Sequence, residues 1–446
     1  MPIDTKYDGY DLAVSKSTKV RDFADGEFTV KAKEDAYLPK LGGQNNVDYK
    51  AYLMRGYVIP AVEPTALAIS GAIMRRPPVF EPSGKLAYLL DDFDGMRTST
   101  NKFIEGMIKE QLYAGVGGYL VEFIDNKAVV KQYARESIIN VSDTYIVLTQ
   151  EYTVQDEKDK YKQETKLECL ELTFDEAGHY IQNIWREDKG RWAIVDTTTP
   201  DIRGDAFTEL PFVFAGELTD DPVLLHLANI NHKQYMQSTD ESHGLHWTAL
   251  PTLFLFGDLR DAEGNKKQLK IGAGSANHIE DETAKAELLE FTGAGLGALK
   301  ASIDSKIQDM ASVGAKMLAS GSDNVKAAET ARIEASSETA TLSTLANTID
   351  STVERVLEIV ARWMGQSVPE FKVNRDFVDI KIDPQDMLAN LQTMQGGGMS
   401  LDTFVNLLFK GEKLPPGVTV VQEIARIESG SQDFDLEKEV VPNEKV

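Results

Sequence analysis

Residues 220–250 read DDPVLLHLANINHKQYMQSTDESHGLHWTAL, and residues 296–319 read LGALKASIDSKIQDMASVGAKMLA. In the first stretch, an acidic pair precedes Pro222, which suits the first position of a helix because proline lacks the N–H that would be unpaired there. In the second, apolar residues recur at steps of three and four from Leu296 to Met317. Both stretches predict long helices, and the first, over 222–250, would reach roughly 40 Å at the α-helical rise.

A polar stretch at 257–292 lies between these two helices and predicts a loop-rich excursion. Two long helices joined by such an excursion resemble a stalk with a tip more than the core of an enzyme. The excursion carries four acidic residues that either form a docking face for a partner or belong to a solvated turn. These are Glu280, Asp281, Glu282 and Glu287.

The chain has 446 residues and a net charge of −24, with one cysteine and 42% hydrophobic residues. This composition is that of a globular chain. A chain this acidic is not expected to hold nucleic acid by neutralising phosphates, which needs a basic surface. Two interpretations remain: a soluble, self-repelling protein, which composition favours, or a surface that DNA passes without sticking. The N-terminus lacks an apolar signal region, and no run approaches 18 apolar residues, so we expect no membrane span.

The N-terminal half predicts helices followed by antiparallel strands. Residues 1–46 are polar and we expect them to be partly ordered, whereas 47–60, the stretch after Pro64 and 98–116 have helical patterns. From Gly117 the period changes to two. Two strands flank Asp125-Asn126, which suits a tight hairpin, and three more strands between 164 and 197 predict a meander. Cys169 lies within one of these strands and is expected to be packed and inert.

A third long helix is predicted from about 327 to 364, with an apolar seam at steps of three and four that includes Val353. The helix or subunit that covers this seam is left open. Further along, FVDIKI at 377–382 is strand-like, and helices are expected at 384–394 and 400–410. The acidic tail, 428–446, is expected to be mobile.

Catalytic and cofactor motifs are weak. GAGLGA at 293–298 matches a dinucleotide fingerprint, but that motif needs a parallel βαβ unit, and here helix follows helix. The glycines are better explained as a bend into the helix. His243 and His246 lie three apart, yet a zinc site needs a third ligand of defined geometry. We therefore expect no cofactor, no metal and no enzymatic activity.

Several motifs together resemble the portal proteins of tailed bacteriophages, in particular a divergent portal-like family of phages of Gram-negative bacteria. They are SGAIMRRPP, DDFDG, LYAGVGGYLVEF, LPFVFAGE, PVLLHLANINHKQYMQSTDE, LPTLFLFG, GAGLGALKASIDSKIQDMASVGAKML and ETARIEASSETATLSTLANTIDSTVERVLEIVARWMG. The resemblance covers roughly residues 45–425. Its motifs are diffuse packing signatures and contain no catalytic fingerprint.

This resemblance implies an α+β portal fold, mostly helical, with an antiparallel β wing, two long stem helices flanking a clip and a helical C-terminal region. The parts would be a wing at 1–210, a strand and the first stem helix at 211–250, a clip at 251–292, the second stem helix and tunnel loop at 293–326, a long helix behind the stem at 327–366, and a small crown with an acidic tail at 367–446.

The resemblance further implies a homo-oligomeric ring, usually of twelve subunits, at one vertex of a virion capsid assembled in the host cytoplasm. Its partners would be the terminase large subunit, head-tail adaptor or tail proteins, the major capsid or scaffolding protein, and double-stranded DNA that passes non-specifically. Lys316 and Lys326 flank the predicted break at 319–329 and would offer isolated phosphate contacts, unless they are ordinary exposed lysines. The alternatives are an acidic virion or scaffold-like protein without a channel, and a nucleotide-binding enzyme that uses GAGLGA.

Overall fold

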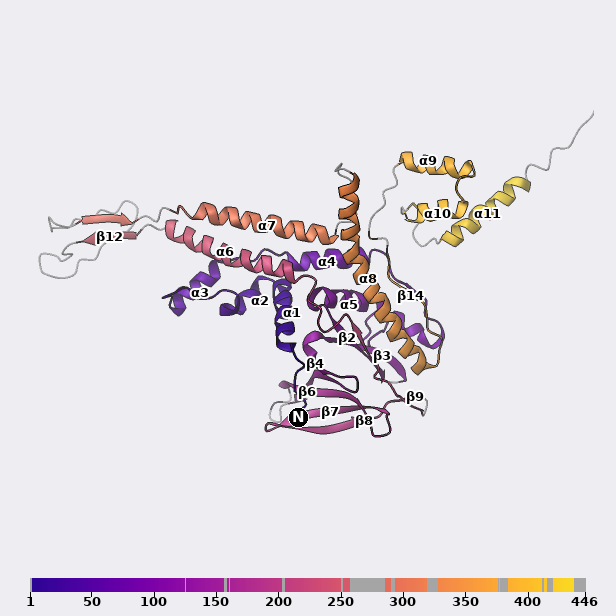
Figure 1. Ribbon diagram of the computed structural model, residues 1–446, viewed down its shortest axis with the longest axis horizontal. Coiled ribbons are helices and arrows are strands. Elements are labelled where there is room, and N and C mark those ends of the chain that lie inside the picture. The colour runs from indigo at the N-terminus through magenta and orange to yellow at the C-terminus, as the bar shows by residue number, and fades with distance from the viewer. Residues whose placement is uncertain are drawn as a thin grey trace, which may run out of the picture.

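The computed structural model shows a mixed α+β chain in which a helical arm projects from a body that contains antiparallel sheets (Figure 1). The structure describes residues 2–124, 126–155, 159, 161–202, 205–249, 252–256, 285–289, 293–318, 328–375, 377, 384–410, 413–414 and 420–436. One large hydrophobic core runs through the body to the base of the arm. The expected α+β class with antiparallel strands is confirmed.

The N-terminal segment is helical, so the expectation of partial order over residues 1–46 is wrong. It forms α1 (Tyr10–Asp25), α2 (Glu27–Ala32) and a 3-10 turn, η1 (Glu34–Ala36). Phe23 and Val30 from this segment are at most 1% exposed and belong to the main core. Gly9 and Gly26 lie at the ends of these helices and have positive φ, whereas Gly42 and Gly43 lie in the turn before α3.

Three predicted helices follow with shifted ends. Helix α3 (Asn46–Arg55) begins after Asn45, whose side chain accepts hydrogen bonds from Val47 N and Asp48 N, and it ends before the predicted stop. Helix α4 (Val62–Ile73) starts two residues before Pro64. Helix α5 (Thr100–Ala114) ends at Gly115, and β1 (Val79–Phe80) and η2 (Gly84–Leu90) lie between α4 and α5.

The body contains two antiparallel sheets. The smaller has the order β11-β2-β3 and is built around the predicted hairpin of β2 (Gly117–Ile124) and β3 (Lys127–Ala134), with β11 (Phe212–Ala215) on the far edge of β2. The larger is a meander, β4 to β8, of which the three strands between 164 and 197 were expected and two were not. Its strands are β4 (Ile138–Val141), β5 (Ile146–Gln155), β6 (Gln163–Phe174), β7 (Tyr180–Asp188) and β8 (Arg191–Thr198).

A short 3-10 turn, η3 (Arg135–Ser137), connects the two sheets, and β9 (Asp201–Ile202) pairs with β10 (Asp205–Ala206) after the meander. Cys169 of β6 is buried beside Tyr10, Ile139 and Val147. Burial raises the pKa of its thiol to about 11, so the thiol stays protonated at neutral pH. The expectation of a packed cysteine is confirmed.

Helix α8 (Ala328–Met364) crosses the smaller sheet, and this sheet, together with α5, covers its predicted seam (Figure 1). Each seam residue is at most 3% exposed: Ala346, Ile349, Val353, Val356, Val360 and Trp363. The partner of the seam therefore includes a β-sheet of the same chain, which a coiled-coil-like pattern did not suggest. A wide apolar stripe on a helix fits a sheet as well as another helix.

The C-terminal part adds β14 (Phe371–Lys372), paired with β1, and helices α9 (Pro384–Gln395), α10 (Leu401–Lys410) and α11 (Val420–Leu436). Arg76 at the end of α4 donates to the carbonyl of Phe409 at 3.1 Å and stacks on its ring, which ties α10 to the body. Residues 428–436 belong to α11, and the expected mobility of the tail at 428–446 stays a prediction. Residues 378–382 of FVDIKI and 437–446 lie outside the described part.

One partly buried group of charged side chains connects α1 to the rest of the body. Arg21 donates to Glu110 of α5 at 2.7 Å and to Glu136 of η3 at 2.9 Å. The Glu110 side chain is 5% exposed, and burial raises the pKa of its carboxyl despite the opposing effect of Arg21. Removing Arg21 alone would leave a buried carboxylate unpaired, which is strongly destabilising.

Candidate functional site: the helical arm and its tip

The arm consists of α6 (Leu225–Ala249), a hairpin of β12 (Thr252–Phe256) and β13 (Lys285–Leu289), and α7 (Leu296–Leu318). Figure 1 shows the two helices side by side, with the hairpin beyond their far ends. At 1.5 Å per residue, α6 is about 37 Å long and α7 about 34 Å. The two predicted long helices of the arm are confirmed. Of the loop-rich excursion predicted at 257–292, residues 285–289 form β13, and 257–284 and 290–292 lie outside the described residues. Helix α6 starts three residues later than expected, because Pro222 belongs to a turn in which Leu225 N donates to its carbonyl.

Glycines set the close approach of the two arm helices near the tip. A Cβ added to Gly244 would lie 2.7 Å from Leu296 Cδ2, and Gly293 has a φ of +62°, a conformation that favours glycine. Leu296 thus packs into the space that Gly244 leaves on α6. Of the three glycines of GAGLGA, Gly293 therefore has a reason beyond flexibility, because it makes the turn into α7. A Cβ added at Gly295 or at Gly297 would meet nothing within 4 Å, so packing does not require glycine at either position. The antiparallel hairpin before α7 also differs from the parallel unit that a dinucleotide site needs.

The base of the arm is held by polar side chains of α6 that face the extended segment after α3. Ile59 N donates to Gln234 Oε1 at 3.2 Å, and Ser238 Oγ donates to the Tyr57 carbonyl at 2.8 Å. Both α6 side chains are fully buried. Because unpaired buried polar groups are costly, these bonds fix α6 against residues 57–59. Between the helices, Gln237 Nε2 donates to Ser302 Oγ at 2.9 Å.

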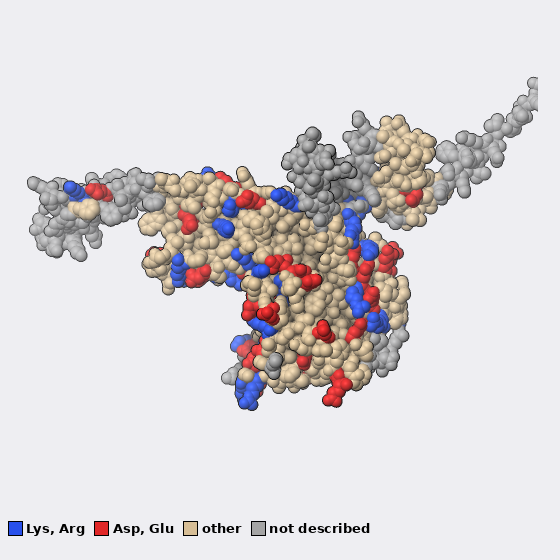
Figure 2. Space-filling model, viewed as in Figure 1, with Lys and Arg blue, Asp and Glu red and all other residues tan. Residues whose placement is uncertain are grey.

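The exposed side chains of α7 are small, polar and charged. Small and polar ones are Gly297, Ala298, Ala301, Ser305, Gln308, Ser312 and Ala315, and charged ones are Lys300, Asp304, Asp309 and Lys316. On the side of the molecule seen in Figure 2, lysines and arginines alternate with acids over the described part of arm and body, and do not gather there into an extended basic surface. That face therefore lacks the charge pattern of a protein that grips phosphates.

Only two of the predicted site residues are described, and they lie far apart along the arm. Lys316 is exposed on the last turn of α7, at the base. Glu287 is exposed on β13, opposite Phe254 in the tip hairpin. Glu280, Asp281, Glu282 and Lys326 lie outside the described residues. The structure thus does not bring Lys316 and Glu287 together, and the suggested roles of all six residues remain predictions.

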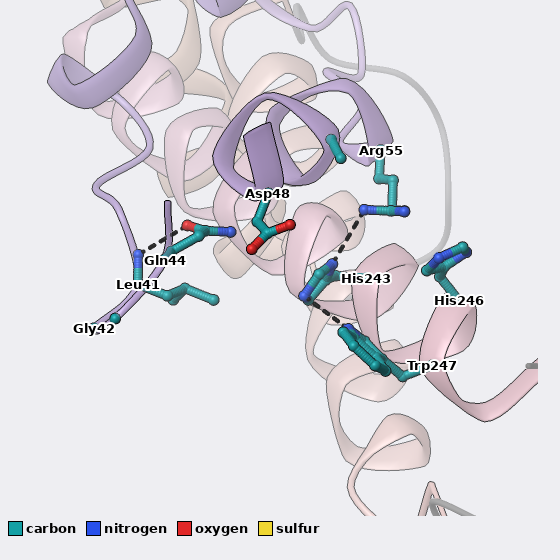
Figure 3. A pocket seen from close by; sticks show the side chains of 10 residues that line it. Leu41, Gly42, Gln44, Asp48, Arg55, His243, His246 and Trp247 are labelled. Carbon is teal, nitrogen blue, oxygen red and sulfur yellow. Dashed lines mark hydrogen bonds between the residues drawn. The ribbon is translucent and has the colours of Figure 1, made fainter. Parts of the chain in front are cut away.

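A groove that the sequence did not predict lies between α3 and the end of α6. It has a volume of about 430 Å³ and is lined by Leu41, Gly42, Gly43, Gln44, Asp48, Ala51, Arg55, His243, His246 and Trp247. Figure 3 shows Arg55 and Trp247 on either side of His243. Trp247 is 56% exposed and Leu41 44%, so the groove presents apolar surface as well as a cation. The groove depends on α3 meeting α6 across nearly 200 residues, and no local sequence signal could reveal it.

His243 is occupied by contacts within the groove. Trp247 Nε1 donates to His243 Nε2 at 3.0 Å, and Arg55 Nη1 lies 3.4 Å from His243 Nδ1. A neutral imidazole has one acceptor nitrogen, so the shorter tryptophan contact is the full hydrogen bond. Burial, Arg55 and His246 lower the pKa of His243, which keeps it neutral at pH 7. With Nε2 taken by the indole, the pair His243 and His246 is poorly arranged to share a metal, and no group of three metal-binding side chains occurs in the described ranges.

Among the described helices, none is both long and apolar enough to cross a bilayer. Residues 223–364, which include the arm and α8, match a family described as a domain of unknown function, DUF4055. No match was found among curated proteins.

Three solved chains are similar in structure to this chain. One is from "Virion of native gene transfer agent (GTA) particle", with 12% identity, a TM-score of 0.40, and coverage of 87% of this chain and 99% of that one. Another is from "Neck of empty GTA particle computed with C6 symmetry", with 13% identity, a TM-score of 0.40, and coverage of 88% of this chain and 99% of that one. The third is from "Neck of native GTA particle computed with C12 symmetry", with 13% identity, a TM-score of 0.39, and coverage of 80% of this chain and 91% of that one.

Proposed function

We propose that this chain is the subunit of a portal ring, the channel through which a tailed phage or phage-like particle packages and ejects DNA. The observation that carries the proposal is the arm, an antiparallel pair of long helices that ends in a hairpin and projects from an α+β body. An isolated arm of this kind buries only part of its surface in its own chain. Repeated around an axis, the same arms would line a tunnel.

In this proposal the body up to about residue 210 is the wing, α6 and α7 are the stem, and residues 251–292, which include β12 and β13, are the clip. The chain between α7 and α8 is the tunnel loop, α8 stands behind the stem, and α9 to α11 form a small crown. The clip would dock the terminase large subunit and the head-tail adaptor or tail proteins, and the wing would face the major capsid or scaffolding protein. The ring would be a part of the virion.

The charge of the chain favours a channel that DNA passes through over a protein that binds DNA tightly. A net charge of −24 repels duplex DNA, and the exposed side chains of α7 include many small ones besides two lysines and two aspartates. DNA inside such a tunnel would move without binding the wall. Lys316, exposed on the last turn of α7, is the described candidate for an isolated phosphate contact.

Imaging the purified full-length chain by negative-stain electron microscopy, with native mass spectrometry on the same sample, tests the proposal. We expect rings of about twelve subunits with an axial hole, since subunits with two different, complementary faces close into a ring when the rotation between neighbours completes a full turn. Oligomers without a hole would favour the alternative of an acidic interaction protein. Monomers alone, across the whole accessible concentration range, would contradict the portal assignment.

A further inference from the structure

The residues before α1 lie on one face of the larger sheet (Figure 1). Every strand of that sheet contributes a side chain to a small hydrophobic cluster on this face, which is separate from the main core: Ile139 from β4, Val147 from β5, Cys169 from β6, Trp185 from β7 and Trp192 from β8. Ile3 and Tyr7 pack on the cluster beside Tyr10 and Val14 of α1. Residues 3–9, here called the strap, therefore cover part of the sheet.

Two hydrogen bonds attach the strap to β4. Tyr7 N donates to the Ile139 carbonyl at 2.8 Å, and Asn140 Nδ2 donates to the Thr5 carbonyl at 2.9 Å. Ile139 lies where the register of β4 against β5 shifts, and the strap supplies a donor for its carbonyl. No further hydrogen bond joins the strap to the described strands. The strap thus closes one edge of the sheet with a small number of contacts.

The closed strap is also weakly stabilised by its own side chains. Ile3 and Tyr7 are half-buried, while the other members are exposed: Asp4, Thr5, Lys6, Asp8 and Gly9. Tyr7 Oη is buried and has no hydrogen-bond partner among the described residues. A buried hydroxyl without a partner lowers the stability of the state that buries it. Two apolar side chains therefore hold the strap against an opposing cost.

Gly9 separates the strap from a firmly held helix. Its φ of +85° favours glycine, and an added Cβ would meet nothing within 4 Å, so conformation rather than packing requires glycine here. Beyond it, Tyr10 Oη donates to the Glu136 carbonyl at 2.5 Å, and Val20 and Phe23 are at most 1% exposed in the main core. Rotation at Gly9 can therefore lift the strap while α1 stays in place.

We propose that the strap opens as a unit of its own, without unfolding of the body, and is a reversible cover for the apolar face of the larger sheet. Segments with few buried contacts open locally while the rest of a protein stays folded. Closed, the strap keeps the cluster around Cys169 from solvent and from other chains. Open, it exposes this cluster together with the Ile139 carbonyl. The inference concerns the single subunit and does not depend on ring assembly.

Cys169 reports the opening directly, because it is the one cysteine of the chain and is 1% exposed in the closed state. Its reaction with the thiol reagent DTNB is followed by absorbance in the full-length chain. We expect labelling in native buffer to be faster than global unfolding permits. We also expect its rate to be nearly independent of urea below the unfolding transition, since local opening exposes little surface.

Val353→Ala separates local opening from global unfolding. Val353 is 1% exposed in the main core, so the variant lowers the stability of the whole fold, but it does not touch the strap. Opening of the strap predicts the wild-type labelling rate in this variant. A rate that rises with urea from the start, and that Val353→Ala raises roughly tenfold or more, would show that only global unfolding exposes Cys169 and would overturn the proposal.

Two further variants locate the movement in the strap. Tyr7→Ala removes an apolar contact of the closed state and should raise the labelling rate roughly tenfold. Gly9→Ala strains the closed hinge and should also raise it roughly tenfold. Phe28→Ala is the matched control, because this aromatic side chain of α2 is 93% exposed and its removal should leave the rate unchanged. An unchanged rate in either strap variant would contradict the proposal, because another movement must then expose Cys169.

Discussion

Among single residues, Gly56 shows how closely the chain before α4 lies on α6. A Cβ at this position would clash with the Thr239 hydroxyl and lie 2.9 Å from Tyr235 Cε2. Both neighbours are buried, and Thr239 is hydrogen-bonded to the Tyr235 carbonyl, so they have little room to move. We expect Gly56→Ala to lower the free energy of unfolding by about 1–3 kcal/mol, measured by urea denaturation.

Gly71 provides the control for this substitution. It lies inside α4, and a Cβ there would meet nothing within 4 Å. Gly71→Ala should leave stability unchanged or raise it by about 0.5–1 kcal/mol, since alanine favours the helix. Equal losses for both variants would show that the packing of Gly56 is not the cause.

His232, at the base of the arm, makes the stability of the fold depend on pH. It bonds to the Tyr37 carbonyl through Nε2 at 2.8 Å, and burial lowers its pKa, with Lys19 adding to the effect. The unfolded chain then binds protons more readily than the folded one, so this contribution to stability is complete above about pH 6.5 and is lost as the pH falls through the depressed value. His232→Asn should flatten the fall of the melting temperature between pH 7.5 and 5.5. A curve parallel to that of the wild type would exclude His232 as a source.

At the scale of elements, α8 joins the arm to the body through its seam on the smaller sheet. Val353 is 1% exposed within that seam. Val353→Asp would bury an unpaired carboxylate, and we expect a loss of about 3 kcal/mol or more in the free energy of unfolding. Ser351→Asp, on the exposed side of the same helix, should change it little. Denaturant unfolding of both variants makes the comparison, and equal stability of the two would contradict the packing of the seam.

Elements with strong periodicity could be predicted from the sequence, and those held by distant contacts could not. Helices α6, α7 and α8 follow their three- and four-residue patterns, and β6 to β8 follow their alternation and turn residues. Helix α1 was missed because its hydrophobic positions are few and flanking glycines imitate loops, although Phe23 is essentially buried. The groove could not be predicted from the sequence for another reason: Arg55 and Trp247 come to line one groove only because α3 packs on α6.

For the whole molecule, net charge governs how the subunit meets DNA. With −24 charges, and with both signs dispersed on the face in Figure 2, the chain should not bind duplex DNA with a Kd below about 100 µM at 0.15 M salt. Fluorescence polarisation with a labelled duplex measures this directly. Binding at micromolar concentration, with an affinity that falls steeply as the salt concentration rises, would indicate a basic surface. It would contradict the proposal that DNA passes the tunnel wall without binding to it.

The buried bonds of Gln234 and Ser238 make α6 and the segment at 57–59 turn together. The arm would then move with the body as a stiff lever about 37 Å long. A rotation of the arm by about 5° about its base would carry the tip through roughly 3 Å, enough to make or break a hydrogen bond. A small movement of the body would in this way displace a partner bound to the hairpin, several helical turns away. A movement of that partner would likewise displace the body.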